Sequence, residues 1–418
     1  AYEIYMGDGV QTCALPIYDN SSFGNDFNTI VYPKVSGSYF ISEEPWFPQS
    51  GLVSQLRVRG AYGQSGRQPS ATDGLFFVAP TSSAVDNVST PAVTFQTGGA
   101  GLAGLKPERS KELELGFDVA LFDSRLGIEF TYFNKLTSDA LINRILPPSA
   151  GGPNSRFENL GSTRNYGIEA AITGQIMRTR SFLWEATFAG SLLKNNLRTL
   201  GPGVPPILIG NQRQVPNYPL GGYWDRPFSF DDANGDGIIA QNEVVVGDTA
   251  VYRGPSVPTR EFSFRTSASF GGGTWRIGAQ FDYRGGHKLF NNTEAFRCTA
   301  TGNNCRGIHD PTAPLDEQAR AIVRRFHSSQ STMGYLEPAD FLKFRELSLS
   351  YRLPSSFAGT FGSRGVLLTL AGRNLFTITD YTGLDPEVQS AGQNNFTSSD
   401  FLTQPQVRTF VFRASLEY

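Results

Sequence analysis

The chain has 418 residues, of which 12% are aromatic, 45 are Gly and 25 are Pro. This composition favours strands and turns over helices. Its 36 basic and 38 acidic residues give a net charge of −2, which excludes an overall positive field for nucleic acid, and we find no local run of Lys or Arg. No stretch of 18 apolar residues is present, so an ordinary transmembrane helix is excluded, whereas a membrane-spanning strand needs only alternate apolar residues.

Residues 9–17 (GVQTCALPI) read as a translation of a common sequencing-library adapter. We therefore expect residues 1–17 to be a cloning or assembly artefact outside the fold, and residues 18–418 to be the natural protein. An ordinary irregular N-terminus is the alternative. If the adapter interpretation is right, the natural protein continues upstream, and the lack of a signal peptide says nothing about its location.

From Val31 onward, apolar and polar residues alternate in stretches that each predict a strand with two unlike faces. The two stretches around Asp123 are typical of a hairpin with a tight turn. In chain order the stretches lie near residues 31–41, 56–62, 113–121, 126–132, 166–172, 182–188, 262–270, 275–283, 347–353, 366–370 and 407–418. The sequence thus predicts about eleven strands, each long enough to cross a bilayer at a tilt.

The connections between these stretches alternate strictly between short and long. Short turns lie near residues 43–51, 123–125, 178–181, 271–274 and 354–365. Long connections lie near residues 67–109, 143–160, 196–259, 288–340 and 378–405. Outer-membrane barrels show this asymmetry because their periplasmic turns are short and their outer loops are long. We therefore predict an all-β, antiparallel transmembrane β-barrel with long extracellular loops.

The final strand fits this architecture. One of its faces carries Phe410, Phe412, Leu416 and Tyr418, and an aromatic residue at the C-terminus is typical of outer-membrane barrels. On the inner faces of the strands we expect charged residues to pair with one another rather than to contact substrate. These residues are Arg57, Arg59, Glu112, Glu114, Asp118, Glu129, Arg276 and Asp282.

Five blocks of sequence resemble the C-terminal half of SusC/RagA-type TonB-dependent outer-membrane receptors, and the resemblance runs from about residue 20 to residue 418. The blocks are residues 56–66 (LRVRGAYGQSG), 105–117 (LKPERSKELELGF), 165–169 (NYGIE), 345–351 (RELSLSY) and 372–375 (GRNL). Their order and spacing identify the superfamily better than they identify a substrate.

The resemblance implies about eleven strands of a presumed 22, and the first half of the barrel, the plug and the TonB-contacting segment on a missing upstream piece. It also implies the outer membrane of a Gram-negative-type bacterium, surrounding outer-membrane lipid, the TonB complex, and import of glycan oligomers or peptides with a SusD-like lipoprotein lid. The alternatives are a receptor for a siderophore or vitamin, and a soluble all-β binding or structural protein. We expect an incomplete barrel with residues 407–418 at one edge and the strand near Val31 at the other.

Residues 232–243 (DANGDGIIAQNE) satisfy the calcium-loop pattern D-x-[DN]-x-[DN]-G-x5-E in full. The pattern predicts calcium ligands from the side chains of Asp232, Asn234, Asp236 and Glu243 and from the backbone carbonyl of Ile238. A polar Asx/Gly turn without metal is the alternative. No cofactor is required, so calcium in an extracellular loop is the one candidate.

Cys298 and Cys305 form an even pair in a long loop, since Cys13 falls in the adapter-like segment. An oxidising envelope location predicts a disulfide; metal binding with His309, or unpaired thiols, are the alternatives. The spacing of apolar residues within 310–326 predicts a short helix, with a disordered loop as the alternative. We find no catalytic motif, and G-x-G-x-x-G at residues 99–104 precedes Pro107 rather than a phosphate-binding helix, so we expect no enzyme.

Overall fold

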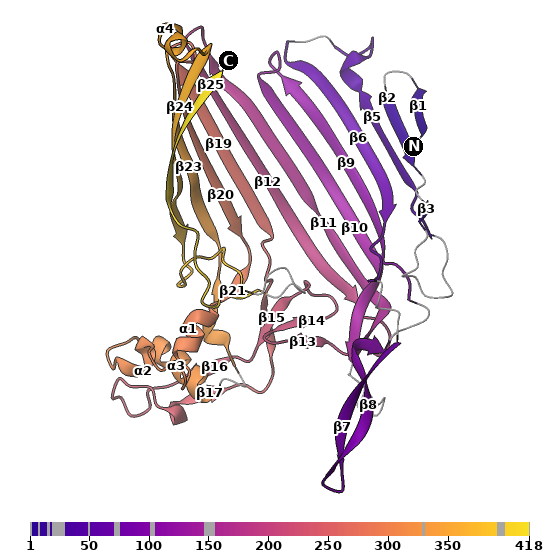
Figure 1. Ribbon diagram of the computed structural model, residues 1–418, viewed down its shortest axis with the longest axis vertical. Coiled ribbons are helices and arrows are strands. Elements are labelled where there is room, and N and C mark those ends of the chain that lie inside the picture. Colours follow the sequence, from indigo (N-terminus) through magenta and orange to yellow (C-terminus); the bar gives the residue numbers. More distant parts are fainter. Residues whose placement is uncertain are drawn as a thin grey trace.

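The structure is a computed structural model that describes residues 2–6, 9–14, 17–18, 30–48, 51–70, 76–100, 105–145, 155–327, 331–390 and 398–417. Its main feature is one antiparallel sheet of thirteen strands, which forms a single curved layer (Figure 1). In sheet order the strands are β1 (Tyr2–Met6), β2 (Gly9–Ala14), β5 (Lys34–Phe40), β6 (Val53–Ser65), β9 (Arg109–Leu121), β10 (Leu126–Ile145), β11 (Ser155–Arg178), β12 (Phe182–Thr199), β19 (Arg260–Phe270), β20 (Trp275–Gly285), β23 (Phe341–Arg352), β24 (Gly365–Thr379) and β25 (Thr409–Glu417).

Each of the eleven predicted strands is present, from β5 to β25. The sheet is not closed: among the described residues, β25 pairs only with β24, which is the open C-terminal edge that we predicted. The opposite edge differs from our expectation, because β1 and β2 extend the sheet beyond β5, with Val10 opposite Ser38. The structure therefore includes residues 2–6 and 9–14 in the sheet, and the adapter origin of residues 9–17 stays a prediction about the gene.

The two faces of the sheet differ in chemistry, and the strand register preserves this difference from one strand to the next. One row of directly opposed residues is apolar: Leu56, Val119, Ile128, Ile172, Phe188, Phe264, Phe281, Phe344 and Phe376. The adjacent row, on the other face, is mostly polar: Arg57, Asp118, Glu129, Ala171, Ala189, Ser263, Asp282, Lys343 and Thr377. A barrel with its apolar face toward lipid and its polar face toward the lumen requires this alternation.

Aromatic side chains mark the short-turn end of the apolar face. Phe182, Phe270, Trp275 and Tyr351 are opposed across four neighbouring strands, and the rings of Trp275 and Tyr351 lie 4.3 Å apart between centroids. Such a row is typical of the interfacial aromatic belt of membrane barrels. On β25, Phe410 and Phe412 are 72% and 69% exposed because no further strand covers them, Leu416 is also exposed, and Tyr418 lies outside the described residues.

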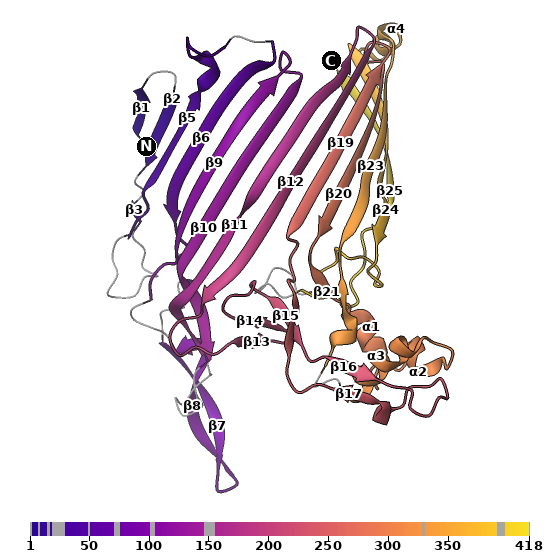
Figure 2. The same cartoon turned by 180° about the vertical axis from the view of Figure 1, so that it is seen from behind.

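The connections divide between the two ends of the sheet as predicted. Figures 1 and 2 show α4 and the short turns at one end, and the long connections gathered at the other. The β19–β20 turn contains Gly271, Gly272 and Gly273 at positive φ, a backbone conformation that favours glycine. The β9–β10 turn places three non-glycine residues, Phe122, Asp123 and Ser124, in the same region.

The long connections contain small sheets and helices of their own. The strands are β3 (Ile17–Tyr18) with β4 (Ile30–Val31), β7 (Phe76–Val85) with β8 (Val88–Ala100), β13 (Ile207–Ile209), β14 (Gln212–Gln214), β15 (Gly222–Asp225) and β18 (Val251–Gly254) together, β16 (Phe228–Phe230) with β17 (Val244–Val246), and β21 (Lys288–Phe290) with β22 (Leu336–Pro338). The helices are η1 (Ile41–Glu43), η3 (Gln241–Glu243), α1 (Asn292–Arg297), α2 (Arg306–His309), α3 (Leu315–Phe326), η4 (Met333–Tyr335), α4 (Ser355–Ala358) and η5 (Gly359–Phe361). The predicted helix within residues 310–326 is therefore present as α3. Among the described residues, no helix combines the length and apolar character needed to cross a membrane.

The buried apolar core lies mainly in these connections rather than in the sheet. The described residues of segments 228–246 and 290–335 pack together around α3, and we call these two segments the loop module. One side of α3 contacts Ile239 and Val244 of the first segment. Ala321 of α3 instead joins the cluster of Cys298 and Cys305. The loop module thus folds around its own small core, whereas the sheet is one layer thick.

Candidate functional site

A groove of about 460 Å³ lies on the polar face of the sheet, which is the inner wall of the predicted barrel. Carboxylates of Glu129, Glu169 and Glu261 line it, together with Arg59 and Arg284. Arg284 lies 3.7 Å from Glu261, whereas Glu129 and Glu169 have no ion-pair partner in the part of the chain that the structure describes. The groove is therefore polar and acidic, and it offers exposed carboxylates to whatever the barrel encloses.

Five of the eight charged residues that we expected to pair along the inner wall do form ion pairs, whereas Glu114, Glu129 and Arg276 have no ion-pair partner among the described residues. The carboxylate of Asp118 accepts hydrogen bonds from Arg57 at 2.6 Å and from Arg59 at 3.3 Å, and the ammonium of Lys135 lies 3.3 Å from the carboxylate of Glu112. Each of these side chains is partly exposed, so each pair contributes at most about 1 kcal/mol. Their main effect is to hold the side chains along the wall.

A more deeply buried ion network closes the loop end of β23. Lys343 is only 4% exposed, and its Nζ donates to both carboxylate oxygens of Asp385 and to Glu387 Oε2, each at 2.8 Å. Arg345 donates to both oxygens of Glu387 at 2.8 and 2.7 Å, and to Asp282 Oδ2 at 2.7 Å. The carboxylates of Asp385 and Glu387, in the connection after β24, are thus bound to the wall, which fixes residues 380–390 against the inner face of the sheet.

The electrostatics of Glu387 reflect this network. Burial alone raises the pKa of a carboxyl group, but the hydrogen bonds from Arg345 and Lys343 outweigh burial and lower the pKa of Glu387 to about 2. Glu387 is therefore charged at neutral pH. We did not predict this network, although the adjacent charges Arg345 and Glu346 between Phe344 and Leu347 indicated an irregular strand. A β-bulge at Arg345, where the register with both neighbouring strands shifts, brings both charges to the inner face.

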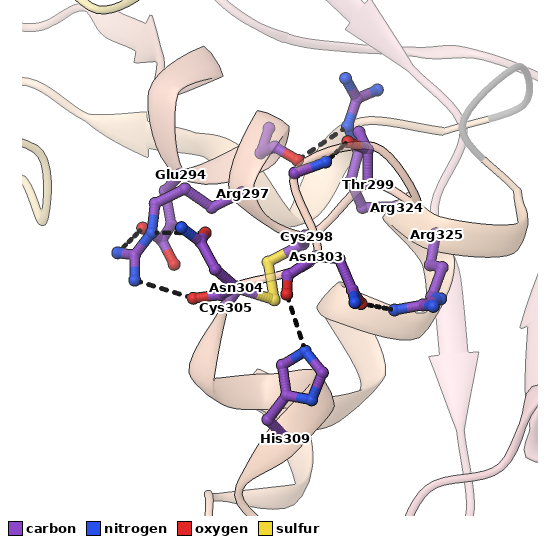
Figure 3. Close-up of a disulfide and its surroundings, with 12 residues drawn as sticks. Glu294, Arg297, Cys298, Thr299, Asn303, Asn304, Cys305, His309, Arg324 and Arg325 are labelled. Carbon is purple, nitrogen blue, oxygen red and sulfur yellow. Dashed lines mark hydrogen bonds and ion pairs between the residues drawn. A yellow bond between two sulfur atoms is a disulfide. The ribbon is translucent and has the colours of Figure 1, made fainter.

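Cys298 and Cys305 are joined by a disulfide with their Cα atoms 5.0 Å apart (Figure 3). Both are buried with Ala295, Ala321 and Tyr335. Hydrogen bonds fix the segment between them: Arg297 donates to Asn304 Oδ1 at 3.2 Å, and Arg325 of α3 donates to Asn303 Oδ1 at 2.6 Å. His309 contacts the carbonyl of Asn303 at 2.9 Å and not the sulfur atoms. The disulfide therefore ties α1 to the loop that leads into α2.

The calcium-like loop lies at the other side of α3. Asp232 accepts backbone hydrogen bonds from Asp236 at 3.2 Å and Gly237 at 3.0 Å, and Glu243 returns to the loop start, where it accepts from Ala233 at 3.1 Å. Gly235 and Gly237 have positive φ. Within the described ranges, no group of three His, Cys, Asp or Glu side chains is placed to hold a metal ion. The carboxylates instead accept hydrogen bonds from the loop itself.

Gln318 connects this loop to α3. The side chain is 3% exposed; its Oε1 accepts from the backbone of Ile239 at 2.9 Å, and its Nε2 donates to the carbonyls of Gly237 at 3.0 Å and Ala313 at 2.8 Å. Every polar group of this amide that faces the loop is thus satisfied, which is what a buried amide requires. Our sequence interpretation missed Gln318 because a single glutamine in a helical pattern carries no distinguishing signal.

Comparison with known proteins agrees with this architecture. Residues 17–375 match the family described as TonB dependent receptor-like, beta-barrel. The chain is 25% identical over 96% of its length to TonB-dependent receptor P3 of Formosa agariphila, and 23% identical over 96% of its length to TonB-dependent receptor SusC of Bacteroides thetaiotaomicron. It covers 43% and 41% of those two proteins, so the chain spans less than half the length of the curated relatives it matches.

A solved structure has the same fold. The structure of the RagAB peptide transporter superposes with a TM-score of 0.79 and 20% sequence identity, over 98% of this chain and 46% of that chain. The matched family consists of outer-membrane receptors and transporters rather than enzymes. The chain therefore belongs to the TonB-dependent receptor-like β-barrel family.

Proposed function

We propose that the chain is the C-terminal half of the barrel of a SusC/RagA-type importer in the outer membrane of a Gram-negative-type bacterium. The single observation that carries the proposal is the division of the molecule: a polar-lined sheet bears nearly all of its long connections at one end, where residues 228–246 and 290–335 fold into one module. A module of this kind offers a surface to large substrates and to a SusD-like lipoprotein. The likeness to SusC and to the RagAB structure supports the same assignment.

The substrates that we propose are glycan oligomers or peptides, and the energy source is the TonB complex. Coupling to TonB requires a plug and a TonB-contacting segment elsewhere in the full-length receptor. The runner-up is a receptor for a siderophore or vitamin. Membership of the family argues against the soluble all-β alternative.

The test measures uptake by cells that express the full-length receptor. We expect uptake of labelled oligosaccharides or peptides that is lost when the tonB gene is deleted and strongly reduced when the gene for the neighbouring SusD-like lipoprotein is deleted. Uptake of an iron chelate or cobalamin that is independent of any such lipoprotein would support the runner-up instead. TonB-independent uptake would contradict both.

We also propose that residues 232–243 bind Ca²⁺ as a structural ion of the loop module. The complete ligand pattern, the two glycines at positive φ and the return of Glu243 to the loop start support this site. Binding would be weak, with a Kd of roughly 10⁻⁴–10⁻³ M, as is typical of extracellular modules.

Calorimetry of the full-length receptor with millimolar calcium tests the ion site. We expect a binding heat that Asp236→Ala removes, because this residue supplies the central ligand of the pattern. Asp248→Ala, a change of an exposed acid just outside the loop, is the matched control and should leave the heat unchanged. If the wild-type receptor gives no heat, or if both variants lose it equally, the loop is a polar turn without metal.

A further inference from the structure

A second groove, of about 700 Å³, lies on the opposite face of the sheet from the acidic groove, near the loop end of β11 and β12. Its floor is formed by outward-facing side chains of the strands, among them Tyr132, Ile168 and Leu192. Val257 and Pro258, from the segment before β19, form its far wall. The groove is therefore mainly apolar, and it faces away from the barrel interior.

The groove exists because two neighbouring strands end at different heights. The last residue pair of β12 with β19 is Leu192 with Arg260, yet β12 continues to Thr199. Beyond this pair one hydrogen bond, from Leu193 N to Thr259 O at 2.9 Å, continues the ladder into the irregular segment 255–259. Leu197 then pairs instead with Asn217 and Tyr218. Pro255 and Pro258 have no N–H group to extend it. The strands involved lie in the middle of the sheet, each with a neighbour on both sides.

The height of the groove in the membrane follows from β12. Leu192 lies ten residues beyond Phe182 of the aromatic row, or roughly 34 Å along the strand. At a tilt of about 40° this is about 26 Å along the barrel axis, close to the height of about 25 Å expected for the apolar band. Leu192 therefore lies at the far margin of that band. Lys194, two residues on and on the same face, reaches about 5 Å further, to the level of lipid headgroups.

Two cations at this level have no acidic partner in the described part of the chain. Lys194 is exposed and lines the groove, directly opposite Tyr166. Arg164, also on β11, lies over the Tyr166 ring at 4.7 Å and donates to Asn134 at 2.9 Å. Arg164 lies beside the groove rather than in its lining, and the other cation that lines the groove, Arg260, is already paired with Asp340 at 3.3 Å. An apolar groove with uncompensated positive charge at its headgroup end is complementary to an anionic lipid.

We propose that this groove is a binding site for one phosphate-bearing lipid of the outer leaflet. The upper part of an acyl chain lies against Ile168 and Leu192, and the phosphate lies between Lys194 and Arg164. The site depends on the proposed orientation in the outer membrane, but not on the substrate or on TonB, so uptake and lipid binding can fail independently.

Native mass spectrometry of the delipidated full-length receptor tests the site, with phosphatidic acid as the probe and phosphatidylcholine as its neutral counterpart. We expect one copy of phosphatidic acid to bind in preference to phosphatidylcholine. Lys194→Gln should weaken phosphatidic acid binding about fivefold, which corresponds to about 1 kcal/mol for one lysine at a membrane surface. Lys194→Arg should retain the preference.

The matched control is Arg198→Gln, which removes an exposed cation from the same strand outside the groove. It should leave phosphatidic acid binding unchanged. If Lys194→Gln binds as the wild type does, or if Arg198→Gln weakens binding equally, the attraction is a general surface charge effect and the proposal is wrong. A dimer that Lys194→Gln dissociates would instead identify the groove as a contact between copies of the chain, which also overturns the lipid assignment.

Discussion

The sheet and the loop module are stabilised in different ways. The sheet is one layer whose apolar side chains, such as Phe188 and Ile172, remain exposed because lipid takes the place of a second layer. The loop module buries Ile239, Val323 and Tyr335 in cores of its own, and it adds a disulfide and a buried amide. The membrane part therefore depends on the alternation of its faces, whereas the loop part depends on individual contacts.

The largest effect should come from the ion network that holds the connection after β24 to the inner wall. Asp385→Ala leaves the buried Lys343 with only Glu387 as an acidic partner, at a cost of about 3–5 kcal/mol if the ammonium stays buried. Hydrogen exchange of the full-length receptor should show faster exchange in residues 380–390, with β11 and β12 unchanged. Arg352→Ala, which breaks an exposed pair with Glu417, should cost less than about 1 kcal/mol. Equal effects of the two variants would show that the network does not fix the connection.

The alternation of the sheet faces can be broken at neighbouring positions of β12. Phe188→Arg places a charge on the apolar face in the middle of the strand, at a cost of about 2–4 kcal/mol near the bilayer midplane. Ser191→Arg faces the interior between Glu169 and Glu261, its directly opposed neighbours, and should be neutral or stabilising. Denaturant unfolding of the full-length receptor in liposomes measures both. A penalty of similar size at the two positions would contradict the assignment of the faces.

Removing the disulfide should loosen the loop module alone. A crosslink with a sequence separation of 7 lowers the conformational entropy of the unfolded chain, which stabilises the folded state by about 2.5 kcal/mol in the chain-entropy model. The double variant Cys298→Ser, Cys305→Ser should therefore speed hydrogen exchange in α1 and α2 without changing exchange in β19 and β20. Gel mobility that does not change on reduction, together with alkylation of both thiols beforehand, would show that the wild-type protein lacks the bridge.

The sequence alone was sufficient to predict the sheet, whose strands are specified by period-two alternation of apolar and polar residues. Eleven strands, their order and the end at which the long connections lie all follow from residues such as Leu113–Leu121 alternating with charged neighbours, because a strand in lipid must present an apolar face. The alternation also located the last strand, and the resemblance to half of a barrel placed that strand at an open edge. It did not reveal β1 and β2, since we had set residues 1–17 aside on grounds unrelated to folding.

The contacts that close the loop end could not be predicted in this way. The partners of Lys343 lie about forty residues along the chain, and no periodicity relates them. The calcium-like motif and the cysteine pair were visible because their own spacing carries chemistry, but their packing on opposite sides of α3 was not. Gln318 is the clearest case, since its role follows only from the backbone groups that surround it.

The smallest expected effect tests how the two segments of the loop module hold together. Gln318→Leu keeps the volume of the side chain but leaves the N–H of Ile239 and the carbonyl of Gly237 without their partner, at a cost of about 1–3 kcal/mol. Exchange of the Ile239 amide should rise, and any calcium affinity of residues 232–243 should fall with it, because the loop loses its support on α3. Gln241→Leu, a change of an exposed glutamine in the same loop, is the control and should change neither. If the Ile239 amide stays protected in Gln318→Leu, the apolar contacts of Ile239 and Val244 with α3 suffice to join the segments, and the loop module resembles an ordinary soluble core.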